Sequence, residues 1–133
     1  MTLNDEKDYI MRMIKEVVRI LFSFMLGKNY TPVEMEKENR YEVSGNNLKD
    51  YFSMIDQGEI NEAENQLLED IDYSDKDNIA AAALFYQYLS EKSEDFLIEH
   101  DYSKEEILDG MKRLVQRAGY GDVFSIVEGL QVM

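Results

Sequence analysis

The stretch that decides the fold of this 133-residue chain is DYIMRMIKEVVRILFSFMLGKN, residues 8–29. Thirteen of the eighteen positions from Tyr9 to Leu26 are apolar, although the chain as a whole carries a net charge of −14. At about 100° per residue, the charged side chains share one narrow stripe of a helix: Arg12, Lys15, Glu16 and Arg19. The remaining circumference is mostly apolar. The pattern predicts one long amphipathic helix over about residues 5–26, ended by Gly27.

A membrane-spanning role is disfavoured for this helix. Its four charged residues would each cost about 2.5–3.5 kcal/mol near the centre of a bilayer, whereas the apolar residues at about −0.5 kcal/mol each return only about −6 kcal/mol. A secretory signal fits no better, because acidic residues precede the apolar stretch and no A-x-A cleavage site follows it. An interfacial helix normally has a wider polar face. We therefore expect a core helix with no integral membrane association, and self-association as a second role.

The composition of the chain excludes several classes of catalytic and metal-binding site. The chain has no cysteine, which excludes disulfides, thiolate metal sites and cysteine nucleophiles and fits a reducing, cytoplasmic location. His100 is the only histidine, so sites that need several histidines are excluded. The acidic run DIDYSDKDN (70–78) lacks the glycine and the final glutamate of a calcium-binding loop, and it predicts an acidic turn. We expect no catalytic residue, no cofactor, no metal and, because the chain is so acidic, no nucleic acid partner.

The rest of the chain predicts further helices in a single domain, residues 1–133. Residues 29–43 form a connection, and residues 44–133 form a helical array that Ser44 or Asn46 begins as a helix cap. Ser103, followed by Glu106, is typical of a second capped helix, and the last residues form a short helix or a strand-like tail. No segment shows the alternation of a sheet. The fold class is therefore all-α, an array of five to seven helices.

One segment resembles a single tetratricopeptide repeat hairpin. In MIDQGEINEAENQLLEDI (54–71), the repeat's glycine, hydrophobic, small and large residues correspond to Gly58, Ile60, Ala63 and Leu67. The segment departs from the repeat at Asp70, where a second small residue is expected, and at Asp75, where a proline is expected. No second copy follows at a spacing of about 34 residues. The resemblance implies one helical hairpin of this type.

A second resemblance covers most of the chain. DYIMRMIKEVVRIL (8–21) and FYQYLSEKSEDFLIEHDYSKEEILDGMKRL (85–114) are similar to an uncharacterised family of short, acidic, all-helical bacterial proteins. Its members begin with D-Y-hydrophobic-x-R-x-I and later carry F-Y-x-aromatic-L followed by S-x-E-E-I. The resemblance implies helices, tetratricopeptide-like packing and a cytosolic setting, and it transfers no functional residue.

Two classes of function remain. The leading hypothesis is a non-enzymatic helical module that binds a protein, a peptide or a second copy of itself as a homodimer. The candidate partner-binding residues are Arg12, Lys15, Val18, Arg19, Phe22 and Tyr86. Each has a simpler alternative, since the basic residues can pair with facing helices and the apolar ones can belong to the core. The second hypothesis is a small-molecule-binding or enzymatic domain with a pocket lined by carboxylates and tyrosines.

Overall fold

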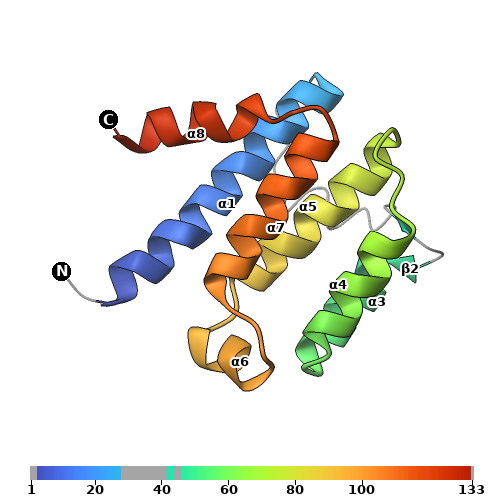
Figure 1. Cartoon of the computed structure of the whole chain (residues 1–133), viewed down its shortest axis with the longest axis vertical. Coiled ribbons are helices and arrows are strands. Elements are labelled where there is room, and N and C mark those ends of the chain that lie inside the picture. The colour runs from blue at the N-terminus through green and yellow to red at the C-terminus, as the bar shows by residue number, and fades with distance from the viewer. Residues whose placement is uncertain (1–2, 28–41, 44–45, 133) are drawn as a thin grey trace.

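A computed structural model describes residues 3–27, 42–43 and 46–132. Over these residues the chain forms seven helices and one two-stranded antiparallel hairpin (Figure 1). The elements are α1 (Leu3–Leu26), β1 (Glu42–Val43), β2 (Asn46–Asn47), α3 (Leu48–Asp56), α4 (Ile60–Glu69), α5 (Lys76–Ser90), α6 (Glu94–Glu99), α7 (Lys104–Arg117) and α8 (Asp122–Val132). The prediction of an all-α array of five to seven helices is confirmed. The predicted connection at 29–43 lies outside the described residues apart from β1.

Helix α5 lies at the centre of the array. It packs against α1 and α7 on one side and against α3, the first helix of the α3–α4 hairpin, on the other (Figure 1). Eleven of its fifteen residues are buried, among them four consecutive alanines, Ala80–Ala83. Alanine side chains let neighbouring helices approach closely, which suits α5 to a central position.

Helix α1 is covered by three helices, which accounts for its broad apolar surface. Helices α5, α7 and α8 all pack against it, and α8 runs back over α1 at the end of the chain (Figure 1). Most apolar side chains of α1 are therefore core residues: Met13, Ile14, Val17, Val18, Ile20, Leu21, Phe22 and Met25. No helix in the described part of the chain is long and apolar enough to cross a bilayer.

Local signals set most helix ends, with one difference from the sequence predictions. Asn47, and neither Ser44 nor Asn46, caps α3, because Asn46 and Asn47 first pair with β1 as a strand. The Asn47 Oδ1 accepts a hydrogen bond from the Asp50 N–H at 3.1 Å, and the Asp50 carboxylate accepts one from the Asn47 N–H. The predicted cap at Ser103 is confirmed by a 3.2 Å bond from the Glu106 N–H. The last residues were predicted to form a short helix or a strand-like tail, and they form the helix α8.

The acidic run at 70–78 is a turn between α4 and α5. The Asp72 carboxylate accepts hydrogen bonds from the Ser74 hydroxyl and N–H, and these bonds lower the pKa of Asp72. Asp75 caps α5 through the Asp77 N–H at 2.9 Å. Both carboxylates therefore stabilise backbone N–H groups, as the prediction of an acidic turn requires.

Candidate functional site

The three basic residues predicted as partner contacts lie exposed on the polar stripe of α1. Arg19 pairs with Glu16 within the helix at 2.7 Å, and this hydrogen bond lowers the pKa of Glu16 and raises that of Arg19. Lys15 pairs with Glu91, just beyond the end of α5, at 3.4 Å. Two of the three, Lys15 and Arg19, thus pair within the chain, which was the alternative that the sequence left open for them.

The three apolar candidates require a correction. Val18, Phe22 and Tyr86 are all fully buried inside the chain. None of them can touch a partner of the folded protein, so a self-association surface through Val18 and Phe22 is wrong. The physical reason is the coverage of α1 by α5, α7 and α8, which together enclose more of its apolar arc than the sequence suggested.

The exposed apolar surface lies elsewhere on the same helix. Among the described residues, five large hydrophobic side chains are exposed, and four of them are on α1 and α8. We call these four the α1–α8 patch: Tyr9 (40% exposed), Phe24 (51%), Ile126 (41%) and Leu130 (52%). The fifth, Ile98, lies on α6.

The helical geometry places all four on the side of α1 and α8 that faces away from α7. Met11 lines a pocket together with Ser90 of α5 and Lys104 of α7, and Tyr9 and Phe24 lie about 140–160° around α1 from Met11. The Nζ of Lys112 on α7 lies over the ring of Phe124 on α8, 5.8 Å from the ring centre. Ile126 and Leu130 lie about 120–160° around α8 from Phe124. Tyr9 and Phe24 are 15 residues apart on α1, and the buried Met13, Val17 and Ile20 lie on the same arc of the helix.

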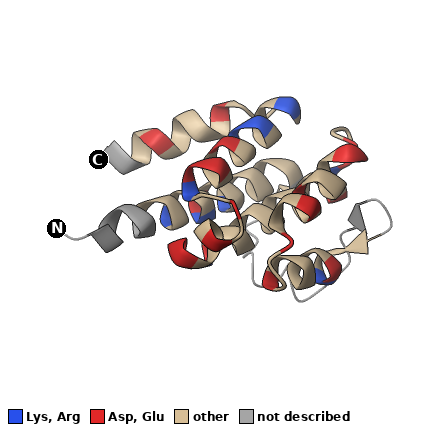
Figure 2. Cartoon of the chain, turned by 60° about the horizontal axis from the view of Figure 1, so that its bottom comes forward, with Lys and Arg blue, Asp and Glu red and all other residues tan. Residues whose placement is uncertain are grey.

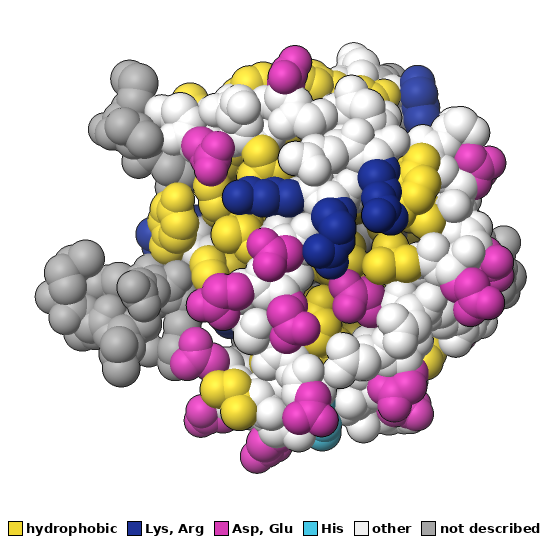
Figure 3. Space-filling view, viewed as in Figure 1, with side chains coloured by type: hydrophobic (Ala, Val, Ile, Leu, Met, Phe, Trp, Pro, Cys, Tyr) yellow, Lys and Arg dark blue, Asp and Glu magenta, His cyan; other side chains and the backbone are white. Residues whose placement is uncertain are grey.

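Charge is distributed unevenly around this patch. Acidic residues are spread over most helices, whereas basic residues gather on α1 and on the C-terminal half of α7 (Figure 2). The space-filling view shows the basic side chains over α7 and hydrophobic side chains along the upper edge, where α8 lies (Figure 3).

Comparison with known proteins identifies the family. Residues 4–119 match the model of a family described as "Family of unknown function (DUF6483)". The chain belongs to this family. The match runs from α1 to the end of α7, so α8 follows the matched region of this DUF6483 chain. No curated protein and no solved structure matches the chain.

A tyrosine–glutamate cluster joins α4, α5 and the start of α7 in this DUF6483 protein. The hydroxyls of Tyr86 and Tyr102 both donate to one oxygen of Glu64, at 2.7 and 3.0 Å. Burial, followed by the nearby charge of Glu64, raises the pKa of both phenols, and Arg113 partly opposes the rise. Phenols held neutral in this way are hydrogen-bond donors and not bases. Gly110 leaves the room that the Tyr86 ring fills, because a Cβ there would clash with that ring.

The aromatic residues near Tyr86 serve helix packing. Phe85 is buried and meets Tyr51 edge-on, with ring centres 6.1 Å apart. Tyr88 stacks on Phe52 with ring centres 4.0 Å apart, and its hydroxyl donates to Asp56 at 2.7 Å. These contacts fix α3 against α5.

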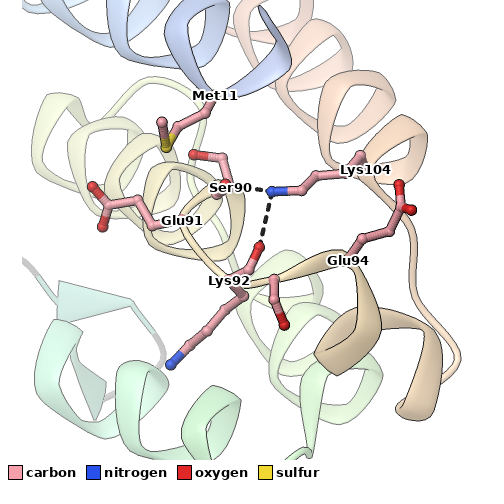
Figure 4. A pocket seen from close by; sticks show the side chains of 7 residues that line it. Met11, Ser90, Glu91, Lys92, Glu94 and Lys104 are labelled. Carbon is pink, nitrogen blue, oxygen red and sulfur yellow. Dashed lines mark hydrogen bonds between the residues drawn. The ribbon is translucent and has the colours of Figure 1, made fainter. Parts of the chain in front are cut away.

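A small pocket lies where α1, the end of α5 and the start of α7 meet. Its volume is about 190 Å³, and it is lined by Met11, Ser90, Glu91, Lys92, Ser93, Glu94 and Lys104 (Figure 4). The buried Lys104 ammonium donates to the carbonyl oxygens of Ser90 and Lys92 at 2.6 and 2.9 Å. A cation there stabilises the negative end of α5. The pocket is smaller than the roughly 300–1,000 Å³ typical of small-molecule sites. Within the described residues no group of three or more His, Asp and Glu side chains is placed to hold a metal ion.

Sequence reasoning missed the four patch residues for a definable reason. Phe24 belongs to the same apolar stretch as Phe22, and only the positions of the neighbouring helices show which of the two is covered. For Ile126 and Leu130 the sequence left two predictions open, a short helix or a strand-like tail. Their spacing of four residues was an available signal, since it places both side chains on one face of a helix.

Proposed function

We propose that this chain is a non-enzymatic helical protein–protein interaction module, and that it binds a protein or peptide through the α1–α8 patch. The observation that carries the proposal is the exposure of four large apolar side chains on α1 and α8: Tyr9, Phe24, Ile126 and Leu130. Exposed apolar side chains that lie close together are characteristic of interaction sites.

The alternative, a small-molecule-binding or enzymatic domain, has weaker support. It would require a cavity lined by carboxylates and tyrosines. The carboxylate and tyrosines that do come together, Glu64, Tyr86 and Tyr102, bind one another, and both phenols are buried. The pocket beside Lys104 is small, and two backbone carbonyls already engage the lysine.

We also propose three further properties of the chain: a tetratricopeptide-like hairpin, a cytoplasmic location and a bacterial setting. The α3–α4 hairpin buries Ile60, Ala63 and Leu67, the residues that the tetratricopeptide resemblance places at its contact. This burial supports tetratricopeptide-like packing of this one hairpin. A cytoplasmic location and a bacterial setting come from the sequence resemblance. Cell fractionation of the untagged protein tests the location, and recovery outside the cytoplasmic fraction would contradict it.

Photo-crosslinking tests the interaction directly. A benzophenone amino acid placed at Phe24 or at Leu130 should yield covalent adducts with a protein in the cells that express the chain. The matched control is the same amino acid at Ile98, which is even more exposed, at 60%, but lies outside the patch. Adducts at the two patch positions and none at Ile98 are expected. Absence of adducts at both patch positions in a folded protein would refute the proposal.

A further inference from the structure

The C-terminal half of α7 reverses the sign of the charge that the rest of the chain carries. Its three basic residues are Lys112, Arg113 and Arg117, and we call them the α7 basic ridge. The segment 110–121, which contains the ridge, has no acidic residue, although the net charge of the chain is −14. The basic side chains over α7 are visible as a group on the molecular surface (Figure 3). The ridge is therefore a place where an anionic group can approach an otherwise acidic protein.

The ridge cations are not neutralised by the part of the chain that the structure describes. Ion pairs with carboxylates hold three other basic side chains: Lys15, Arg19 and Lys92. None of the ridge cations forms such a pair with a described residue. Two of them lie over aromatic rings instead, Lys112 at 5.8 Å from the ring centre of Phe124 and Arg117 at 5.9 Å from that of Tyr73. These contacts position the cations and leave their charge available.

Helical geometry spreads the three cations over the exposed side of α7. At about 100° per residue, Lys112 and Arg117 lie about 140° apart around the axis, and Arg113 lies between them. Lys112 is on the side of α8, which carries Phe124, and Arg117 is on the side of the α4–α5 turn, which carries Tyr73. Along the axis the ridge extends about 7.5 Å. It is thus an elongated, convex basic surface.

The dipole of α7 explains only one of the three cations. A positive charge is stabilised near the C-terminus of a helix, and the effect falls off within the last turn. Arg117 is the last residue of α7 and gains from it. Lys112 and Arg113 lie more than one turn earlier, where little of this stabilisation remains. Two exposed or half-exposed cations therefore stand side by side without a structural role that requires both.

We propose that the α7 basic ridge binds a short acidic segment of a partner protein. Cations spread over the convex side of a helix suit an extended ligand better than a single compact anion. In an extended chain, alternate residues point the same way and lie about 6.5–7 Å apart. Two acidic side chains at that spacing match the length of the ridge along α7. The binding energy comes from opposite charges that meet at an exposed surface.

Acidic residues on both sides of the ridge limit the length of the ligand. Glu105, Glu106 and Asp109 precede the ridge on α7, and Asp122 follows it at the start of α8. Charges act over about 8 Å at physiological ionic strength, so a long polyanion such as nucleic acid would be repelled at both ends of the ridge. A segment of about four residues avoids this repulsion. The ridge is also separate from the α1–α8 patch, which faces away from α7.

Titration with acetylated tetraglutamate, followed by nuclear magnetic resonance of the isotope-labelled chain, tests the proposal. The peptide should shift the amide signals of the C-terminal half of α7. The variant Lys112→Gln/Arg113→Gln should raise the dissociation constant at least about fivefold, because it removes two of the three cations. Circular dichroism verifies that the variant is folded. The matched control, Lys49→Gln/Lys76→Gln, removes two exposed cations from other helices and changes the net charge equally. It should change the dissociation constant less than about twofold.

Each contrary outcome overturns a stated part of the proposal. Signals of α7 that do not shift, or equal weakening by the two double variants, would show that the ridge is not the binding surface. A thymidine tetranucleotide that binds more tightly than tetraglutamate would overturn the choice of an acidic protein segment. Inorganic phosphate that produces the same shifts with the same affinity would overturn the extended ligand. None of these results bears on the α1–α8 patch, which the crosslinking experiment tests separately.

Discussion

At the scale of single residues, Gly58 and His100 show how a turn fixes the approach of two distant segments. Gly58 has φ +86°, and a Cβ built on it would clash with the imidazole of His100. His100 in turn packs on Phe96, with ring centres 4.7 Å apart. Asn61 donates to the carbonyl oxygen of Asp101 at 3.2 Å. The turn between α3 and α4 therefore docks onto the end of α6 because residue 58 has no side chain.

Gly58→Ala should destabilise the fold by about 1–3 kcal/mol, because it combines the cost of a positive φ with the clash against His100. Urea unfolding followed by circular dichroism measures the change. Gly129→Ala is the control, since a Cβ there meets nothing within 4 Å and alanine favours a helix. Equal effects of the two substitutions on the free energy of unfolding would contradict this role of Gly58.

Lys104 is a second single residue with a definable role. Lys104→Met keeps most of the aliphatic stem but leaves the carbonyls of Ser90 and Lys92 without the ammonium donor. We expect a loss of about 1.5–3 kcal/mol in the free energy of unfolding, the usual range for a hydrogen-bonded charged group. The exposed Lys49→Met provides the matched control in the same denaturation assay. A loss no larger than that of the control would rule out the capping role.

At the scale of elements, α8 determines how much of α1 is covered. Val123, Phe124 and Val127 are its buried residues, and they hold it against the rest of the fold. Ile126 and Leu130 project from the same helix into solvent. One face of α8 thus completes the core, while another side supplies half of the α1–α8 patch.

Val127→Asp should detach α8, because an aspartate carboxylate cannot be buried at this fully enclosed position without a partner. Hydrogen exchange read by mass spectrometry should show loss of protection in α8 and in the face of α1 beneath it. The neighbouring exposed position provides the control, Ser125→Asp, which should leave exchange unchanged. Retained protection in α8 of the Val127 variant would show that this helix does not depend on its buried stripe.

At the scale of the whole molecule, the buried phenols couple the stability of the fold to alkaline pH. The pKa values of Tyr86 and Tyr102 are raised above their ordinary value of 10.0 by burial and by Glu64. The contribution of the two neutral phenols to the free energy of unfolding is complete below pH 10. It is lost as the pH rises further, because the phenols ionise only after unfolding. Above about pH 10, ionisation of each phenol in the unfolded chain should lower the free energy of unfolding by about 1.4 kcal/mol per pH unit.

Urea unfolding between about pH 9 and 11 measures this dependence. Tyr86→Phe should unfold more readily at neutral pH, because Glu64 loses one of its two phenol donors. Its stability should nevertheless fall less steeply at alkaline pH than that of the wild type. Parallel pH profiles for the two proteins would show that ionisation of Tyr86 is not linked to unfolding.

The sequence by itself determined the helical elements, because the signals that define them are local. The periodicity of residues 8–29 predicted α1 to within two residues at its start, and Ser103 marked the start of α7. The family resemblance was also readable, since it depends on short motifs in the matched region.

Only the tertiary structure decided which apolar residues are buried and which form a surface. Phe22 and Phe24 are equally apolar and two residues apart, yet one is fully buried and the other is half exposed. The difference arises because α5, α7 and α8 approach α1 from directions that no local pattern encodes. The pairing of both Tyr86 and Tyr102 with Glu64 has the same origin, since their bonds span 22 and 38 residues of sequence. Burial is a property of the assembled helices, and the α1–α8 patch is the apolar surface that their packing leaves exposed.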